Sequence, residues 1–301
     1  MSGNAPYGIF DVAVAAKRLL SPHMVRLTFA GAGVANMETY APDQRIKLFF
    51  PADDGRAPAI PDRPDWYAVY RAAAPKDRVP MRTYTIRDLR AGQGEVDVDF
   101  VLHGDAGPAS RWALRATVGD AIQIAAPRRD HAGERGGFEW KPPREAGDIL
   151  VIADETALPA VAGIIESLAA RQRPPAVQAF IEVPTAADRL DLPAFDGLSV
   201  EWLARETATG AAGYGDLMVA AAGKARLPPP AAARGDTLQD FDHDGEILWD
   251  RAEATSAPFY AWVAGETGAV SRIRHYLVKE RAIDRRLVNL MGYWRLGKVL
   301  D

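Results

Sequence analysis

Cysteine is absent from this chain. Its absence excludes disulfide bridges, thiolate zinc sites, iron–sulfur clusters and cysteine nucleophiles, so any redox chemistry needs a bound cofactor. Long hydrophobic runs are missing too. The longest apolar stretches, such as ILVIA and YAWVAG, fall far short of the roughly 18 residues that a membrane helix needs. We therefore expect no membrane span and no signal peptide, and a cytoplasmic protein.

Long blocks of basic residues are also absent. The 36 Lys and Arg residues face 40 Asp and Glu residues, which gives a formal net charge of -4. This balance argues against nucleic acid as the main partner. With 301 residues, of which 48% are hydrophobic and 25% charged, the chain can bury a sizeable core. Its length fits about two domains.

The first half, residues 1–145, is predicted to be a small antiparallel β-barrel. Between about residues 7 and 128, apolar residues lie two apart in short segments broken by Gly and Pro, which is the period of strands with one buried face. These segments are Val25-Leu27-Phe29, Ile46-Leu48-Phe50, Val96-Val98-Phe100 and Ile122-Ile124. The Pro- and charge-rich stretch 51–80 is predicted to be a long surface loop.

The second half, residues 146–301, follows a linker-like stretch (136–148) and is predicted to be a doubly wound α/β domain. Continuous apolar runs predict parallel strands at 148–153, 177–183, 198–204 and 259–265. Helical spacing follows the first run at Leu158, Val161, Ile165 and Leu168, and the last at Val270, Ile273 and Leu277. A Pro-, Ala- and Asp-rich insertion near 224–250 is predicted to be a mobile loop.

The segment RTYT, residues 82–85, combines a cation, an aromatic ring and hydroxyl groups. On a strand, Arg82 and Tyr84 point to the same face, with Thr83 between them. This arrangement suits a flavin nucleotide. The guanidinium can pair with pyrophosphate oxygens, the ring can pack on the isoalloxazine, and Thr85 can reach the N5 edge. An ordinary amphipathic strand is the alternative.

In the segment DFVLHGDAGPASRWA, a strand is predicted to end at His103 and a short helix to begin near Pro108. The first N–H groups of such a helix, with the hydroxyl of Ser110 beside Ala109, can bind an anion. Two plainer interpretations stay open, in which Ser110 only caps the helix and His103 is a satisfied strand-end residue.

Two strand-to-helix turns of the second half carry acidic residues. The first, ADETALPA, lacks the G-x-G-x-x-G pattern of common dinucleotide folds, yet Asp154 and Thr156 place amides and a hydroxyl at the crevice above the sheet. An acidic helix start is also normal for helix stability. The second turn contains Glu266. Arg205, after the third strand, fits either a 2′-phosphate partner or a solvated surface charge.

Taken in order, RTYTIRD, DFVLHGDAGPASRWA, VGDAIQIAAPR, ADETALPA, WVAGETGAVSRIRHYL and GYWRLGK resemble the siderophore-interacting protein family. These are flavin-dependent ferric-siderophore reductases of the ferredoxin-reductase-like superfamily. The resemblance covers nearly the whole chain apart from about 51–80 and 224–250. It implies an FAD-binding barrel, an NAD(P)H-binding α/β domain, a monomer, and an anionic ferric siderophore, such as a catecholate, as substrate.

The resemblance also implies roles for individual residues. Those of the flavin motif are Arg82, Tyr84 and Thr85, those of the segment that wraps the flavin are His103, Ala109 and Ser110, and those of the nicotinamide-side turns are Thr156 and Glu266. Thr85 and Glu266 are thus the candidate catalytic residues. Lys47 matches a basic position that holds the iron chelate, and Arg295 and Lys298, beside Tyr293 and Trp294, are looser candidates. No protein ligands to iron are implied.

Three functional hypotheses follow. The first is an NAD(P)H-dependent ferric-siderophore reductase, with a ferredoxin as a further possible electron donor. The second is a less selective flavin or ferric reductase, in which the basic candidates are ordinary surface charges. The third is a siderophore- or flavin-binding shuttle without turnover. The ADETALPA and WVAGETG turns favour an enzyme, because a shuttle needs no nicotinamide site.

Overall fold

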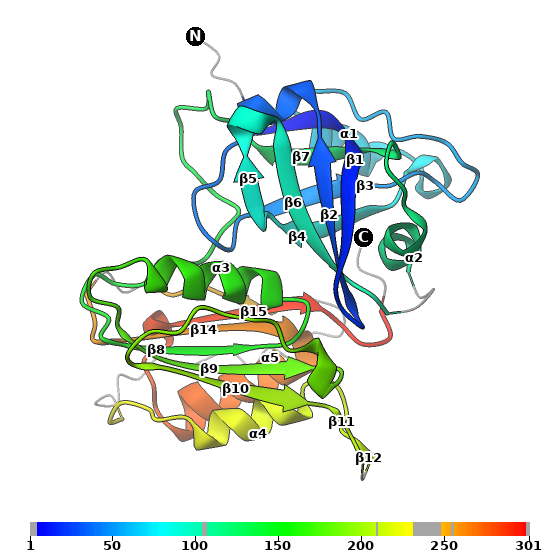
Figure 1. Ribbon diagram of the computed structural model, residues 1–301. Coiled ribbons are helices and arrows are strands. Elements are labelled where there is room, and N and C mark those ends of the chain that lie inside the picture. The colour runs from blue at the N-terminus through cyan, green and yellow to red at the C-terminus, as the bar shows by residue number, and fades with distance from the viewer. Residues whose placement is uncertain (1–4, 104–106, 209, 231–247, 254–255, 299–301) are drawn as a thin grey trace. The chain divides into compact units, whose positions relative to one another are not determined.

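The computed structural model describes residues 5–103, 107–208, 210–230, 248–253 and 256–298 (Figure 1). The chain divides into two compact units between Phe138 and Glu139. This point lies inside the stretch predicted as a linker. The part of this stretch after the boundary is held by the second unit, because the Tyr260 hydroxyl donates a hydrogen bond to the Glu139 carbonyl (2.9 Å) and accepts one from the Lys141 amide (3.0 Å).

The first unit is built on one antiparallel seven-stranded sheet, in the order β4-β3-β7-β1-β2-β6-β5. The strands are β1 (Tyr7–Ser21), β2 (Met24–Ala30), β3 (Arg45–Phe49), β4 (Met81–Thr85), β5 (Asp88–Arg90), β6 (Glu95–Val101) and β7 (Ala121–Pro127). Because β4 and β6 lie near opposite ends of this order and yet touch, the sheet curls into a barrel (Figure 1). The predicted β-barrel is confirmed.

Alternation in the sequence accounts for the barrel core. The apolar residues predicted to face inward on β2, β3, β6 and β7 are all buried. Helix α2 (Pro108–Arg115) adds Ala109 and Ala113 to this core, and its Trp112 stacks on Phe29 with ring centroids 6.2 Å apart. Short 3-10 turns complete the unit at η1 (Ala32–Asn36), η2 (Pro75–Asp77) and η3 (Ala91–Gln93).

The stretch 51–80 differs from the predicted surface loop. It contains helix α1 (Trp66–Ala72), whose Trp66 and Tyr70 lie four residues apart and pack edge-on against Phe49 at 5.7 and 5.6 Å. The Tyr70 hydroxyl also donates to the Val79 carbonyl (2.9 Å). The prolines and charges hid this helix, although two aromatic residues at helical spacing were its signal.

The second unit has a six-stranded sheet in the order β10-β9-β8-β14-β15-β13. Its parallel strands are β8 (Asp148–Ala153), β9 (Ala176–Val183), β10 (Leu198–Ala204), β14 (Phe259–Glu266) and β15 (Val288–Trp294), with β13 (Trp249–Asp250) antiparallel at one edge. A small hairpin pairs β11 (Glu206–Thr207) with β12 (Gly210–Ala211). The predicted doubly wound sheet is confirmed.

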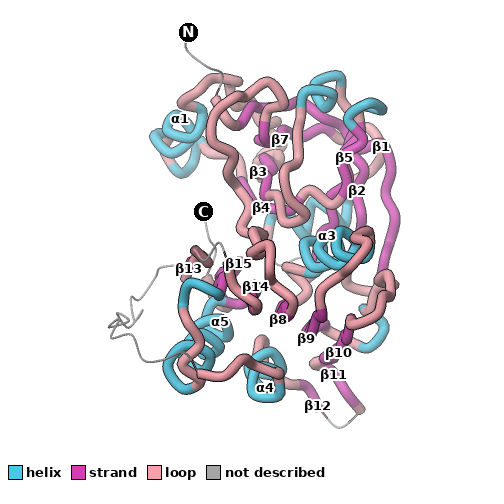
Figure 2. The backbone as a smooth tube through the Cα atoms, turned by 90° about the vertical axis from the view of Figure 1, so that its left-hand side faces the viewer, coloured by secondary structure: helices cyan, strands magenta, loops and turns pink. Residues whose placement is uncertain are grey.

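Helices cover both faces of this sheet. In Figures 1 and 2, α3 (Leu158–Ala169) lies on one face, and α4 (Asp216–Lys224) and α5 (Thr267–Arg274) lie on the other. The π-helical turn η5 (His275–Glu280) continues α5, and the 3-10 turns η4 (Ala186–Asp188) and η6 (Arg285–Leu287) follow β9 and precede β15. The residues predicted on the inward faces of α3 and of α5 with η5 are buried.

Helix α4 was not predicted. Most of the insertion predicted near 224–250, residues 231–247, lies outside the described residues. Within the described ranges, no helix has both the length and the apolar character needed to cross a bilayer.

Candidate functional site

Strand β4 presents the RTYT residues on two faces. Across the β3–β4 pair, Arg82 lies opposite Leu48 and Tyr84 opposite Ile46, so these side chains share the face that packs against the barrel core. Thr83 lies opposite Lys47 on the other face. Arg82 and Tyr84 therefore do share one face, as predicted, and Thr83 does not belong to it.

The Tyr84 ring is anchored in the barrel. It packs on Phe100 with ring centroids 4.4 Å apart, and on Phe50 at 6.5 Å. Burial raises the pKa of Tyr84 above its usual value, so the phenol stays protonated and can donate a hydrogen bond. Thr85, the predicted catalytic residue of this strand, is buried with only 6% of its surface exposed.

Beside Arg82 there is a cavity of about 240 Å³. Three arginines, Arg78, Arg82 and Arg111, line it together with Pro108 at the start of α2 and with the carboxylate of Asp53, which pairs with Arg111. Guanidinium groups and the first turn of a helix are the donors that bind a diphosphate. This donor set fits the diphosphate part of FAD, and it fits the role predicted for Arg82.

Arg78 and Arg111 were missed by the sequence reasoning. Arg78 is held by the loop that follows α1, through bonds to the carbonyls of Ala73 (2.8 Å) and Arg71 (2.7 Å). Arg111 pairs with the exposed Asp53 (3.3 Å). Arg78 reaches the cavity only because stretch 51–80 folds over this side of the barrel. No local sequence pattern therefore indicated that Arg78 belongs to the site.

Ser110 and His103 are joined rather than separate. The Ser110 hydroxyl accepts a hydrogen bond from the His103 amide (3.0 Å), which ties the end of β6 to the start of α2. Gly107 is the N-cap residue of α2, so the interpretation in which Ser110 caps the helix is wrong. Ala109 is buried against the barrel core, where its small side chain lets the helix approach the sheet.

Lys47 alternates away from its buried neighbours Ile46 and Leu48, as predicted. Its Nζ donates to the Thr83 hydroxyl (2.6 Å). Partial burial, and then the nearby charge of Arg45, lower the pKa of Lys47. Lys47 and Thr83 thus form a polar pair on the face of the β3–β4 ribbon opposite Arg82 and Tyr84.

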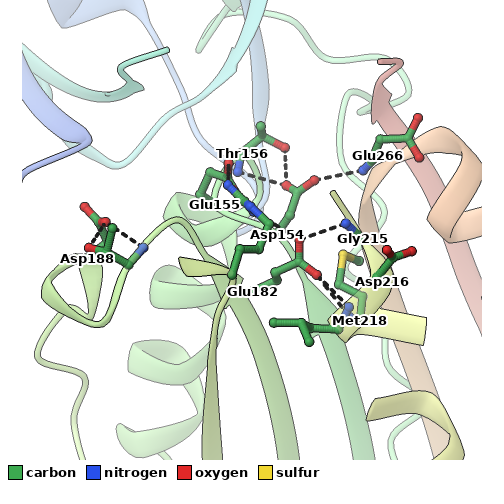
Figure 3. Close-up of polar contacts among 12 residues, drawn as sticks. Asp154, Glu155, Thr156, Glu182, Asp188, Gly215, Asp216, Met218 and Glu266 are labelled. Atoms are coloured by element: carbon green, nitrogen blue, oxygen red, sulfur yellow. Dashed lines mark hydrogen bonds and ion pairs between the residues drawn. The ribbon is translucent and has the colours of Figure 1, made fainter. Parts of the chain in front are cut away.

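In the second unit, Asp154 lies at the end of β8 and is almost fully buried (Figure 3). Its Oδ1 accepts bonds from the Thr156 amide (2.9 Å) and hydroxyl (2.5 Å), and its Oδ2 accepts bonds from the Glu266 amide (2.8 Å) and Trp294 Nε1 (2.7 Å). Burial, and then the neighbouring Glu155, raise the pKa of Asp154 to about 7.

These contacts correct the expectation of free donors at the first turn. The Thr156 amide and hydroxyl are engaged by Asp154, the Ala157 amide bonds to the Asp154 carbonyl (3.1 Å), and the Leu158 amide bonds to the Glu155 carbonyl (3.4 Å). A buried carboxylate takes nearby donors because water cannot reach it. The turn is therefore not a phosphate-binding loop of the G-x-G-x-x-G kind.

Arg205 is buried in an ion-pair network. Its guanidinium binds Glu155 through two bonds of 2.7 and 2.6 Å, and Glu182 through one of 3.0 Å. The Tyr214 ring lies 4.4 Å from the guanidinium carbon. The interpretation of Arg205 as a solvated surface charge is therefore wrong. Its guanidinium also serves two internal carboxylates, so the geometry gives no support to contact with a 2′-phosphate.

Glu182 links this network to α4 (Figure 3). Its carboxylate accepts bonds from the amides of Gly215 (2.8 Å), Leu217 and Met218 (3.1 Å each) at the start of that helix. Sequence reasoning missed Glu182, because a lone acidic residue inside an apolar strand has no spacing signal that names its partners.

Glu266, the second predicted catalytic residue, is the N-cap of α5. Its Oε2 accepts a bond from the Ala269 amide (2.8 Å), and its Oε1 accepts one from the Leu296 amide (3.3 Å). The carboxylate therefore holds two backbone segments. Arg295 and Lys298 follow the end of β15, with Arg295 half-buried and Lys298 exposed.

Two family descriptions match this chain. Residues 13–131 match the siderophore-interacting FAD-binding domain, and residues 146–297 match the siderophore-interacting protein family. The two matches cover the barrel and the α/β unit in turn.

Among similar proteins, the ferric vibriobactin reductase ViuB of Vibrio cholerae is 27% identical over 94% of this chain and 88% of its own length. The NADPH-dependent ferric-chelate reductase of Escherichia coli is 30% identical over 62% of this chain and 68% of its own length. A siderophore utilization protein from T. fusca has a solved structure that is 29% identical and covers 99% of this chain and 97% of its own, with a TM-score of 0.73. The chain belongs to the siderophore-interacting protein family.

Proposed function

We propose that this protein is an NAD(P)H-dependent reductase of ferric siderophores that uses bound FAD. One observation carries the proposal. The cavity of three arginines beside β4 and α2 offers a diphosphate site, in a unit that matches an FAD-binding domain. The names of the V. cholerae and E. coli relatives support ferric chelates as substrates. We also propose that the protein acts in the cytoplasm, where nicotinamide donors are made.

The reaction joins a two-electron donor to a one-electron acceptor. Bound FAD would supply this link, because a flavin can accept a hydride and release electrons one at a time. Siderophores hold Fe(III) with hard anionic oxygen donors, which bind the less charged Fe(II) far more weakly, so reduction releases the metal.

The residues of the chain would bind and orient FAD. In this proposal Arg78, Arg82 and Arg111 hold the diphosphate, the Tyr84 ring packs beside the flavin, and Thr85 faces its N5 edge. The cation cluster is the part with direct geometric support. His103, Ala109 and Ser110 are proposed to complete this site, and the His103–Ser110 bond ties the end of β6 to α2.

The nicotinamide donor is proposed to bind at the carboxyl ends of β8 and β14, where open α/β sheets bind their ligands. Thr156 lies there, beside Asp154 and Glu266. Because the Thr156 hydroxyl donates to Asp154, its lone pairs remain available to accept a bond from a nicotinamide carboxamide. Lys47, Arg295 and Lys298 are proposed to attract the anionic chelate.

An anaerobic absorbance experiment tests the proposal. The FAD-loaded protein is reduced with NADPH or NADH, and a ferric tris-catecholate is then added together with a ferrous trap. We expect the flavin to bleach, and then to recolour as trapped Fe(II) forms. A flavin that bleaches but ignores the chelate would point to another electron acceptor. A flavin that never bleaches would overturn a nicotinamide donor and favour a protein donor such as a ferredoxin, or a binding protein without turnover.

A further inference from the structure

The end of β15 is fastened to the β14–α5 turn on both sides of one residue, Arg295. The peptide before Arg295 is held by the Thr267 hydroxyl, which donates to the Trp294 carbonyl (2.8 Å). The peptide after it is held by the Leu296 amide, which donates to Glu266 Oε1 (3.3 Å). A third bond runs from Trp294 Nε1 to Asp154 Oδ2 (2.7 Å).

Asp154 Oδ2 also accepts the Glu266 amide, so one carboxylate oxygen joins the turn to the strand end. This requires glycine at position 265, since a Cβ there would lie 2.6 Å from Asp154 Oδ2. The strand pairing shifts here as well. Gly265 pairs with Gly292 and Glu266 pairs with Trp294, so Tyr293 is an extra residue on β15. Bulges of this kind redirect side chains and are frequent next to active sites.

Arg295 itself is left for an external partner. The two carboxylates that fasten this segment are occupied by other donors, Glu266 by two backbone amides and Asp154 by donors on both oxygens. Within the described ranges, the Arg295 guanidinium makes no ion pair with Asp or Glu. A rigid backbone that carries an uncommitted cation is well suited to bind an anion, because little conformational entropy is lost on binding.

We propose that Asp154, Glu266 and Thr267 are positioning residues that fix Trp294 and thereby present Arg295 to the anionic ferric chelate. Glu266 then acts through Arg295 rather than on the reacting atoms. The inference rests on the proposed function for the identity of the chelate. Selectivity for charge then depends on Asp154, Glu266 and Thr267, here called the clamp, which need not touch the substrate.

The test measures binding to the full-length, oxidised protein without any electron donor, by calorimetry. Two probes are compared, a ferric tris-catecholate with three negative charges and an uncharged ferric tris-hydroxamate. Arg295→Gln should weaken binding of the catecholate by about tenfold or more, and binding of the hydroxamate by less than about twofold. Trp294→Phe keeps the ring that packs edge-on against Tyr214 at 5.1 Å but removes the Nε1 donor. It should weaken binding of the catecholate by about threefold.

The double variant separates positioning from general damage. If Trp294 acts through Arg295, adding Trp294→Phe to Arg295→Gln should change the catecholate Kd by less than about twofold. Equal effects of Trp294→Phe with and without Arg295, or equal effects on both probes, would overturn the inference. Trp202→Phe is the control. Trp202 lies on β10, at the edge of the same sheet that is separated from β15 by three strands, and this change should leave both Kd values unchanged.

A second pair of variants covers the case in which Trp294→Phe does not fold. Thr267→Val removes the hydroxyl bond to the Trp294 carbonyl at nearly constant volume, whereas Thr267→Ser keeps it. Catecholate binding should fall in the first and recover in the second. Because no electron transfer is needed, the two proposals fail separately. A chelate that binds through Arg295 but is never reduced would remove the reductase and leave the clamp, whereas a chelate that is reduced equally well by all these variants would remove the clamp.

Discussion

Two clusters of buried and half-buried charges, one in each unit, have different surroundings. In the barrel, Arg78, Arg82 and Arg111 line a cavity. The side chains of Arg78 and Arg82 donate hydrogen bonds to backbone carbonyls of residues close to them in sequence. In the α/β unit, Glu155, Glu182 and Asp154 are buried at the carboxyl edge of the sheet, and each accepts bonds from internal donors. The arginines of this barrel cluster line a cavity, whereas the carboxylates of the α/β cluster fix backbone segments. The contrast holds for these two clusters only, because the buried Asp97 and Asp99 of the barrel are paired with Arg90 and Arg26.

The difference teaches which charged residues to assign to ligands. Arg82 and Arg205 are both arginines close to predicted nucleotide sites. A cation beside a cavity gains a partner when a ligand binds, whereas a cation already paired with two carboxylates must first lose them. The environment of the guanidinium therefore decides the role, and the residue type alone does not.

Replacing Arg205 should give the largest effect. Arg205→Met leaves Glu155 and Glu182 buried without their cation, which should lower the free energy of unfolding by about 3–5 kcal/mol. Urea denaturation measures this. The control is Lys224→Met, which breaks an exposed pair with Glu201 and should cost about 1 kcal/mol or less. Similar losses of stability in the two variants would contradict the claim that the buried Arg205 network fixes the structure of this unit.

Asp154 should make stability depend on pH. Its pKa in the folded protein, about 7, lies above its ordinary value of 3.8, so the folded state holds a proton that the unfolded chain has lost. This contribution is complete below pH 4 and is lost as the pH rises to 7, with a slope of up to about 1.4 kcal/mol per pH unit. Asp154→Asn should remove that slope from unfolding curves, while Asp148→Asn, at the exposed start of the same strand, should keep it.

Arg82→Ala should affect ligand binding more than folding. Loss of a charge-assisted contact to a diphosphate should weaken FAD binding by roughly tenfold to a hundredfold. The free energy of unfolding of the apoprotein should change by about 1 kcal/mol or less. Flavin fluorescence and urea denaturation report the two quantities. The control, Arg63→Ala, removes an exposed residue paired with Asp65 and should retain FAD. A variant that purifies with full FAD would remove Arg82 from the phosphate site.

Lys47→Glu is the mildest change. It should raise KM for an anionic ferric chelate by about threefold to tenfold, because a charge that attracts the substrate becomes one that repels it. FAD content should stay the same, since Lys47 does not line the cavity of arginines. Steady-state kinetics with Lys76→Glu, an exposed reversal on η2, corrects for the change in net charge. Equal KM values in both variants would leave Lys47 outside the substrate site.

Sequence reasoning succeeded for the local patterns of the strands, although it missed the short helices α1 and α4. Strands β8 and β10 have the predicted bounds, and β9 and β14 differ from theirs by one residue, because uninterrupted apolar runs mark buried parallel strands. It failed where a partner is distant in sequence. Arg205 meets Glu155 from 50 residues away, and the bulge at Tyr293 exists only in the pairing of β15 with β14.

By itself, the sequence determined the two-unit architecture, and it placed Arg82 and Tyr84 on one face of a strand and Ser110 on a short helix. Alternating and continuous apolar patterns arise because each strand buries its own apolar residues. The residues of a local motif lie on the strand or helix that carries the motif. Only the tertiary structure decided that Arg205 is internal, that Glu266 caps a helix, and that Arg295 is held from both sides. These roles depend on which donors burial brings to each carboxylate, and burial is a property of the packed chain.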